Sequence, residues 1–201
     1  MSVDQLTERV QGLLDRQEIL DVVTRFARAA DRLDRDLYLS TYHPDAEDDH
    51  AVFVGGREEF YDWMETTLRE QRHSTHHFLG NHAVEIEDTV AHAETYFIAS
   101  SLTKGRKPFS MVGGRYIDQL VKENGRWMIL KRLVLTDWQL PVAEQPEESA
   151  TASLEHFPPR ERAVAESREL PHRDRADASY QRPLEISKER LAAYRSAMRN
   201  S

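Results

Sequence analysis

The sequence predicts an α+β domain in which N-terminal helices pack on one face of an antiparallel sheet. Apolar residues recur at helical spacing only within the first 70 or so positions. Four runs with strand-like alternation follow, and the stretch "ENGR" at 123–126 is typical of a tight hairpin turn. Helices that precede a block of strands favour the α+β class over alternating α/β units.

Three helices are expected. Asp15 and Glu18 have the spacing of a capping box and predict the start of the first helix. Its buried stripe consists of Ile19, Leu20, Val23, Phe26, Ala27 and Ala30. A short second helix is expected from about Asp36 until Pro44, because proline disfavours helix at the preceding residue. The segment 57–72 predicts a third, amphipathic helix with Phe60, Trp63, Met64 and Leu68 on its apolar side.

Strands are expected in five places. "DDHAVFVGG" at 48–56 predicts one short strand, and longer ones are expected at about 75–87, 89–102, 108–123 and 127–139. The last run, "WMILKRLVLTDW", has apolar residues at both odd and even positions. We therefore expect both faces of the sheet to be covered, one by helices and the other by a second subunit in a homo-oligomer, a dimer or trimer.

The composition changes near residue 140. We therefore divide the chain into a domain at 1–140 and a charged C-terminal arm at 141–201, which is rich in Pro, Glu, Arg and Ser. So few large apolar residues cannot offset the entropy of ordering the arm. We expect it to be partly disordered or packed on a neighbouring subunit, with a short helix at about 188–198 capped by Ser187.

Charge and composition exclude several classes of function. The net charge of −8 argues against nucleic acid or an anionic membrane as the main partner. No run approaches 18 apolar residues, and "MSVDQLTERV" lacks the layout of a signal peptide. There is no cysteine for a disulfide or a thiolate zinc site. We expect a cytoplasmic protein whose partner is a small-molecule substrate.

Asp31 is the residue that conflicts with its predicted surroundings. It follows Ala27 by four residues and so continues the buried stripe of the first helix. It also lies in the last turn, where the helix dipole disfavours an anion. Such a position is often functional. The alternatives are that Arg28 or Arg32 neutralises Asp31, or that the helix ends early and leaves it in water; Asp34 and Asp36 are read as surface or capping residues.

The stretch "HSTHHFLGNH" at 73–82 contains four of the nine histidines. Neighbours in a strand point to opposite faces, so these histidines cannot converge on one metal ion. A zinc site would have to combine Asp49, His50 and one of His76 or His77, without a recognised ligand spacing. A general base formed by one histidine beside Asp31 is the more economical hypothesis. Alternation alone leaves open whether His76 or His77 faces inward, and His73 is expected to be solvated.

The segments "AADRLDRDLYLSTYHPDAEDDH" and "THHFLGN" resemble the scytalone dehydratase and SnoaL-like branch of the nuclear transport factor 2-like superfamily. The resemblance covers roughly residues 10–140 and implies a cone-shaped α+β barrel, in which a curved antiparallel sheet wraps a pocket closed by helices. Asp31 and His77 match the family's Asp–His dyad, which favours His77 over His76. The dyad removes a proton from carbon without a metal or organic cofactor. His50 falls where scytalone dehydratase has a tyrosine that polarises the substrate through water.

The pocket departs from the family pattern. Ala30 stands where scytalone dehydratase has another tyrosine, and Ser100 stands at about the place of its second histidine. Gly114 and Tyr116 replace a serine and an asparagine, and Phe26 replaces a tyrosine of the bile-acid dehydratases. The resemblance therefore implies similar chemistry on a different substrate.

We expect a cofactor-independent lyase that acts on a hydroxylated aromatic or polycyclic molecule. His77, oriented by Asp31, is the expected base, and His50 or Tyr116 is expected to hydrogen-bond the developing oxyanion or the departing oxygen. The expected substrate contacts are His50, Tyr116, Trp63, Phe26 and Ser100. The aromatic residues Phe60, Trp63 and Phe78 suit such a substrate but are equally typical of a core.

Other functions stay open. If the base takes its proton from a hydroxyl, the same residues would drive a retro-aldol cleavage that releases a small aldehyde. The fold is shared with the β-subunits of ring-hydroxylating dioxygenases, which serve as scaffolds. A small-molecule binding module, a cyclase and a metal-using enzyme are further alternatives.

Overall fold

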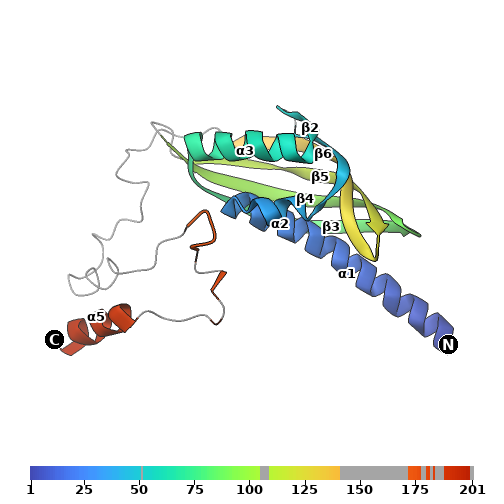
Figure 1. The fold of residues 1–201 in the computed structure, drawn as a ribbon, viewed down its shortest axis with the longest axis horizontal. Coiled ribbons are helices and arrows are strands. Elements are labelled where there is room, and N and C mark those ends of the chain that lie inside the picture. Colours follow the sequence, from blue (N-terminus) through green and yellow to red (C-terminus); the bar gives the residue numbers. More distant parts are fainter. Residues whose placement is uncertain are drawn as a thin grey trace. The chain divides into compact units, whose positions relative to one another are not determined.

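The computed structural model describes residues 1–50, 52–104, 109–140, 172–177, 180, 181, 183 and 188–199. The chain divides into two units, Met1–Glu144 and Gln145–Ser201. In the first unit two helices are followed by short strands, a third helix and four long strands, so the predicted order of elements is confirmed (Figure 1).

The first helix is much longer than predicted. Helix α1 spans Val3–Arg32 and begins at Ser2, which forms a capping box with Gln5. Asp15 therefore lies in mid-helix, and its predicted role as a cap is wrong. The apolar side chains before it are exposed, and Figure 1 shows this end of α1 extending beyond the sheet. The helix ends at Leu33, which adopts the left-handed conformation.

Two further helices complete the layer. Helix α2 is only Arg35–Leu39, and the Asp34 carboxylate caps it by accepting the Leu37 N–H at 3.1 Å. Pro44 does not end this helix, contrary to prediction, because it already lies in a strand. Helix α3 spans Arg57–Gln71, within one residue of the predicted segment.

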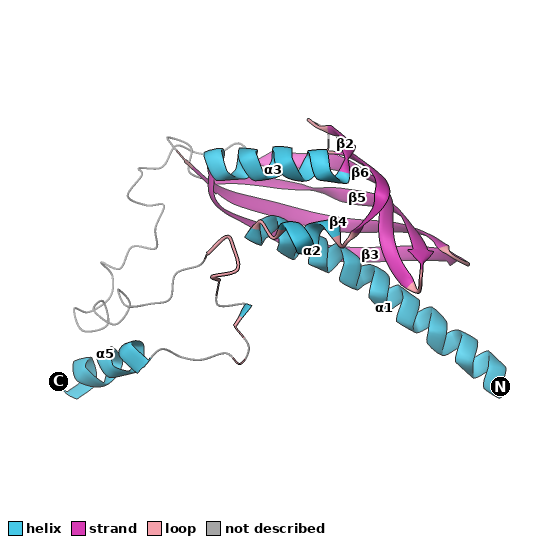
Figure 2. Ribbon diagram, in the orientation of Figure 1, coloured by secondary structure: helices cyan, strands magenta, loops and turns pink. Residues whose placement is uncertain are grey.

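The sheet has six strands in the order β2-β1-β6-β5-β4-β3. They are β1 Tyr42–Asp49, β2 Val54–Gly56, β3 Arg72–Glu87, β4 Val90–Thr103, β5 Phe109–Glu123 and β6 Arg126–Leu140. Strand β1 pairs with β6 in parallel, so the sheet is mixed rather than wholly antiparallel, and it is not closed. The helices lie along this curved sheet, which gives the predicted cone-like α+β fold (Figure 2).

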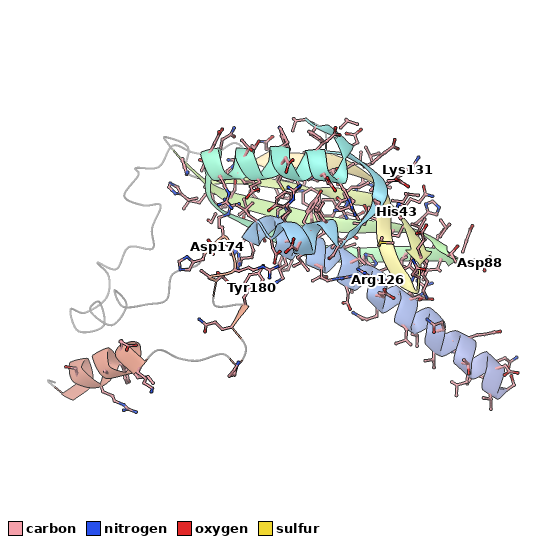
Figure 3. The ribbon with its side chains drawn as sticks, viewed as in Figure 1. His43, Asp88, Arg126, Lys131, Asp174 and Tyr180 are labelled. Atoms are coloured by element: carbon pink, nitrogen blue, oxygen red, sulfur yellow. The ribbon has the colours of Figure 1, made fainter. Side chains whose placement is uncertain are left out.

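The predicted single strand at 48–56 is a β1–β2 hairpin instead. The two strands are antiparallel, and between them the His50 N–H donates to the Phe53 carbonyl at 2.8 Å. The predicted Asn–Gly turn between β5 and β6 is confirmed, since Asn124 and Gly125 both have positive φ, 50° and 75°. The β3–β4 hairpin turns at Asp88, which lies at the far tip of the sheet (Figure 3).

The core lies between the helices and the inner face of the sheet. Its largest fully buried side chains are Trp127, Tyr38, Tyr42, Tyr61, Tyr116, Phe26 and Phe60. These rings stack in tilted and edge-on pairs, such as Phe26 with Tyr116 at 5.5 Å between centroids. Burial of this aromatic layer fixes α1 against the strands that carry the candidate site.

The outer face of the sheet exposes large apolar side chains, namely Phe78, Tyr96, Ile98, Leu133 and Trp138. Gly113 allows the Trp138 ring to lie close to the sheet, because a Cβ at that glycine would come within 2.1 Å of it. Exposed apolar patches of this kind mark interaction surfaces. That a second subunit covers this face stays a prediction.

The described part of the second unit contains helix α5, Lys188–Arg199, which confirms the predicted helix at about 188–198. Its predicted cap, Ser187, and residues 141–171 of the arm lie outside the described residues. Among the described residues no helix combines the length and the apolar content needed to cross a membrane.

Candidate active site

Asp31 lies in the last turn of α1 and is only 9% exposed. Its carboxylate is held by His77 of β3 at two points. Oδ2 accepts the backbone N–H of His77 at 2.9 Å, and Oδ1 lies 2.8 Å from the ring nitrogen Nδ1. Thr75, two residues earlier on the same face of β3, adds a side-chain hydrogen bond. We call this arrangement the Asp31–His77 pair.

A bulge in β3 explains why alternation could not identify the inward histidine. The pairing of β3 with β4 shifts between Leu79 and His82. Before the bulge the odd-numbered residues Thr75, His77 and Leu79 face inward. After the bulge the even-numbered residues, such as Val84, face inward. His77 and Val84 therefore share a face although one number is odd and the other even. His76 points to the outer face and is exposed.

The ionised Asp31 carboxylate determines which ring nitrogen of His77 carries the hydrogen. Burial acts to raise the pKa of Asp31, but the hydrogen bonds and charge of His77, with that of Thr75, hold this pKa below its usual value. The carboxylate is then ionised and can only accept, so Nδ1 of His77 carries the hydrogen. In the neutral ring this leaves the lone pair on Nε2, which is the tautomer that a general base needs.

A cavity of about 340 Å³ adjoins the pair. Its lining residues are Thr24, Ala27, Arg28, Asp31, Arg32, His77, Phe78 and Leu79. A larger hollow of about 930 Å³ includes Ile117 and Leu133, whose side chains point to the outer face, and it contains neither member of the pair. We place the candidate site at the smaller cavity because the ionisable groups converge there.

A second histidine–carboxylate contact lies at the end of β1. The ring nitrogen Nδ1 of His50 is 2.8 Å from Oδ1 of Asp48, and Oδ2 of that carboxylate accepts a short hydrogen bond from the Tyr42 hydroxyl. Asp48 is 1% exposed, while the His50 side chain is 22% exposed. We call these two residues the Asp48–His50 pair.

The other predicted contacts divide into two groups. Phe26 and Tyr116 are buried core residues, and their ring centroids lie 6.5 and 6.4 Å from that of His50. Trp63 packs on Phe53 at 5.5 Å and is part of the α3 layer. Ser100 pairs with His76 and follows the outward parity of β4, so the structure does not bring it to the Asp31–His77 pair.

Sequence reasoning missed Asp48 and Thr75. Each lies two residues before a candidate histidine, and such neighbours in a strand share a face, so the spacing itself was the available signal. It also missed the buried ion pair between Arg132 and Asp118, joined by two bonds of 2.7 Å. Among the residues that the structure describes, no three His, Asp or Glu side chains are grouped to hold a metal ion.

The fold and these contacts can be compared with known proteins. A family model described as the SnoaL-like domain matches residues 11–133. The chain belongs to the SnoaL-like family. This confirms the resemblance seen in the sequence, and the structural neighbours of this SnoaL-like chain belong to the nuclear transport factor 2-like superfamily. A search of the curated proteins returns no match.

Solved structures support the fold alone, because their sequence identities are low. A type 2 hexachlorocyclohexane dehydrochlorinase, LinA, has a TM-score of 0.63 and 17% identity, over 69% of this chain and 98% of its own. A Novosphingobium aromaticivorans protein described as a scytalone dehydratase has a TM-score of 0.60 and 19% identity, over 68% and 95%. A Mycobacterium tuberculosis protein of unknown function has a TM-score of 0.57 and 16% identity, over 94% and 92%.

Proposed function

We propose that this SnoaL-like chain is a cofactor-independent lyase that eliminates water, or a similar leaving group, from a hydroxylated aromatic or polycyclic ketone. The observation that carries the proposal is the two-point contact between Asp31 and His77. A scaffold has no need to bury a carboxylate in the last turn of a helix, where both burial and the helix dipole oppose it. Two of the structures with a similar fold bear the names of eliminating enzymes, a dehydratase and a dehydrochlorinase.

In the proposed step Nε2 of His77 removes a proton from the carbon next to the substrate carbonyl. Asp31 fixes the tautomer and orientation of the ring and stabilises the imidazolium that forms. The electron pair of the broken C–H bond forms the new double bond as the leaving oxygen departs. A positioned base of this kind contributes about 10² to 10⁴ in rate, and orientation in the cavity would supply the remainder.

The shape and polarity of the cavity suit the aromatic class of substrate. Ala27 and Leu79 supply apolar walls beside the pair, and about 340 Å³ is within the range that holds a two-ring molecule. Arg28 and Arg32 line the same cavity, and their positive charge would favour a substrate that carries oxygen substituents.

The test uses β-hydroxytetralone, a bicyclic ketone whose elimination of water gives naphthol, followed by naphthol fluorescence against the uncatalysed rate. We expect the wild-type chain to accelerate naphthol release and His77→Gln to lose most of that acceleration. His76→Gln is the matched control, because this neighbouring histidine faces outward. Equal rates for wild type and His77→Gln would contradict the proposed function.

A further inference from the structure

We propose that His50, held by Asp48, is the proton donor of the same reaction and protonates the oxygen that leaves. The inference rests on the proposed function and deepens it, since it assigns base and acid to two different histidine–aspartate pairs. His50 is the catalytic residue in this assignment, and Asp48 is the positioning residue that acts through it.

The local geometry prepares His50 for this task. Asp48 is buried, and its Oδ1 lies 2.8 Å from Nδ1 of His50, a position at which a carboxylate accepts the Nδ1 hydrogen. The Tyr42 hydroxyl donates to the other oxygen and prevents the carboxylate from turning. The ring is also packed against Phe60, with 4.4 Å between centroids. These contacts hold the ring by its Nδ1 edge and by one face, and in the proposed assignment its Nε2 edge meets the substrate.

The buried polar groups behind His50 form one connected network. Arg132 binds Asp118 through two bonds of 2.7 Å, and both side chains are 0% exposed. Asp48 adds a second carboxylate to this network through Tyr42, whose hydroxyl lies 3.4 Å from Nη1 of Arg132. The network thus contains one guanidinium and two carboxyl groups, and the second carboxyl group contacts the His50 ring. His50 is the group through which this buried network meets a substrate in the proposed assignment.

Two residues connect His50 to the Asp31–His77 pair. Phe26 of α1 lies 6.5 Å from His50 between ring centroids, and Asp31 is five residues further along the same helix, a rise of about 7.5 Å. Tyr116 lies 6.4 Å from His50. Burial raises the pKa of Tyr116; Arg132 opposes that rise, while the carboxylates of Asp118, Asp31 and Asp48 increase it. The Tyr116 phenol is thus within electrostatic range of both pairs.

The two pairs differ in the way that an acid and a base should differ. The Asp31 carboxylate is satisfied by the His77 backbone N–H and by Thr75 as well as by the ring. Asp48 receives one hydroxyl besides the His50 ring. In the proposed step the C–H electron pair forms the double bond, the C–O bond breaks, and the oxygen takes the proton of His50, directly or through one water. The product is the unsaturated ketone plus water, and proton transfer through solvent restores both histidines.

The experiment compares two substrates that differ only in the leaving group. Hydroxide leaves β-hydroxytetralone with a proton from an acid, whereas acetate leaves β-acetoxytetralone without one, and both reactions release naphthol. We expect His50→Gln to slow the hydroxy substrate by about 10²-fold or more and the acetoxy substrate only slightly. His77→Gln should slow both. Asp48→Asn should resemble His50→Gln with a smaller loss, since it disturbs the position of the ring and leaves the acid in place.

The ratio of the two rates is measured on the same preparation, so partial misfolding of a variant cancels. His43→Gln is the matched control on β1 and is expected to leave the ratio unchanged. His43 lies at the opposite end of the strand from His50, where it contacts Glu123 at 3.3 Å (Figure 3).

If His50→Gln slows both substrates equally, His50 is not the acid, and the base function stands. Wild-type turnover of the acetoxy substrate alone would also overturn the inference. Turnover of neither would refute the proposed function and the inference together.

Discussion

Asp15 and Asp31 are two carboxylates on the buried side of one helix, each 9% exposed, and they serve different purposes. Asp15 accepts hydrogen bonds from Trp127 Nε1 at 3.0 Å, from the Lys122 ammonium and from Gln11. All three partners are donors that bond to Oδ1, and the bonds from Trp127 and Lys122 join α1 to the end of the sheet. The contact is a structural brace.

Asp31 differs because its main partner can exchange a proton. The His77 ring gives one nitrogen to the carboxylate and keeps the other for a substrate, and both residues line a cavity. The comparison teaches that burial of a carboxylate does not by itself indicate function. What distinguishes the two sites is whether the partner has a second titratable atom that faces open space.

The largest expected effect on activity comes from replacing the Asp31 carboxylate. Asp31→Asn replaces an acceptor with an amide that can donate to Nδ1, which favours the wrong tautomer of His77. We expect kcat/KM for naphthol release to fall by about 10² to 10⁴, with little change in thermal stability. Asp21→Asn is the control, because Asp21 is exposed on the same helix and contacts Gln17. Equal losses of kcat/KM in Asp31→Asn and Asp21→Asn would show that Asp31 has no special role in catalysis.

Replacing the Asp15 carboxylate should lower stability and leave activity unchanged, the opposite of the pattern expected for Asp31. Asp15→Ala leaves the indole N–H of Trp127 and the Lys122 ammonium without their acceptor, and we expect the free energy of unfolding to fall by about 1–3 kcal/mol. The activity of the folded fraction should not change. Urea denaturation measures the first quantity and naphthol release the second. The double variant Asp15→Ala with Lys122→Met should recover part of the stability, because it removes the unpaired charge.

The sequence predicts most of the fold because its strands are long and alternate clearly, and because Asn124 and Gly125 specify a tight turn. It fails at the start of α1, since Leu6 and Leu13 are exposed there and form no buried stripe. Asp15 then resembles a cap at the start of a shorter helix. The parallel β1–β6 pairing is also missed, because it depends on contacts distant in sequence.

The candidate site is partly predictable for similar reasons. Asp31 is identified by its place on the helical stripe, which is a local property. The choice of His77 over His76 depends on a bulge that lies two residues further along β3, and no residue pattern in the strand reveals it. The Asp48–His50 pair, by contrast, follows from spacing, because the two residues lie two positions apart in the predicted strand at 48–56 and so share a face.

Acid should reduce the contribution that Asp15 and Asp31 each make to the free energy of unfolding. In each case burial acts to raise the pKa, but hydrogen bonds hold the folded-state pKa below 3.8, so the unfolded chain binds the proton more readily. Their contribution to stability is therefore complete above pH 3.8 and is lost as the pH falls through the folded-state values. We expect the difference in urea midpoint between wild type and Asp15→Ala to shrink on going from about pH 6 to about pH 3. A difference that grows on acidification would mean that Asp15 has a raised pKa and is not ion-paired.

The smallest effect is expected at Arg16, which directly follows Asp15 and ties α1 to β3 from outside. Its Nη1 donates to the Val84 carbonyl at 2.7 Å, but the side chain is exposed and water can replace either partner. Arg16→Gln should therefore change the free energy of unfolding by no more than about 0.5 kcal/mol. Measured beside Asp15→Ala under the same conditions, it separates the effect of burial from that of position, since the two residues are adjacent on one helix. A loss as large as that of Asp15→Ala would show that burial of the bonded group does not determine the stability of the contact between α1 and the sheet.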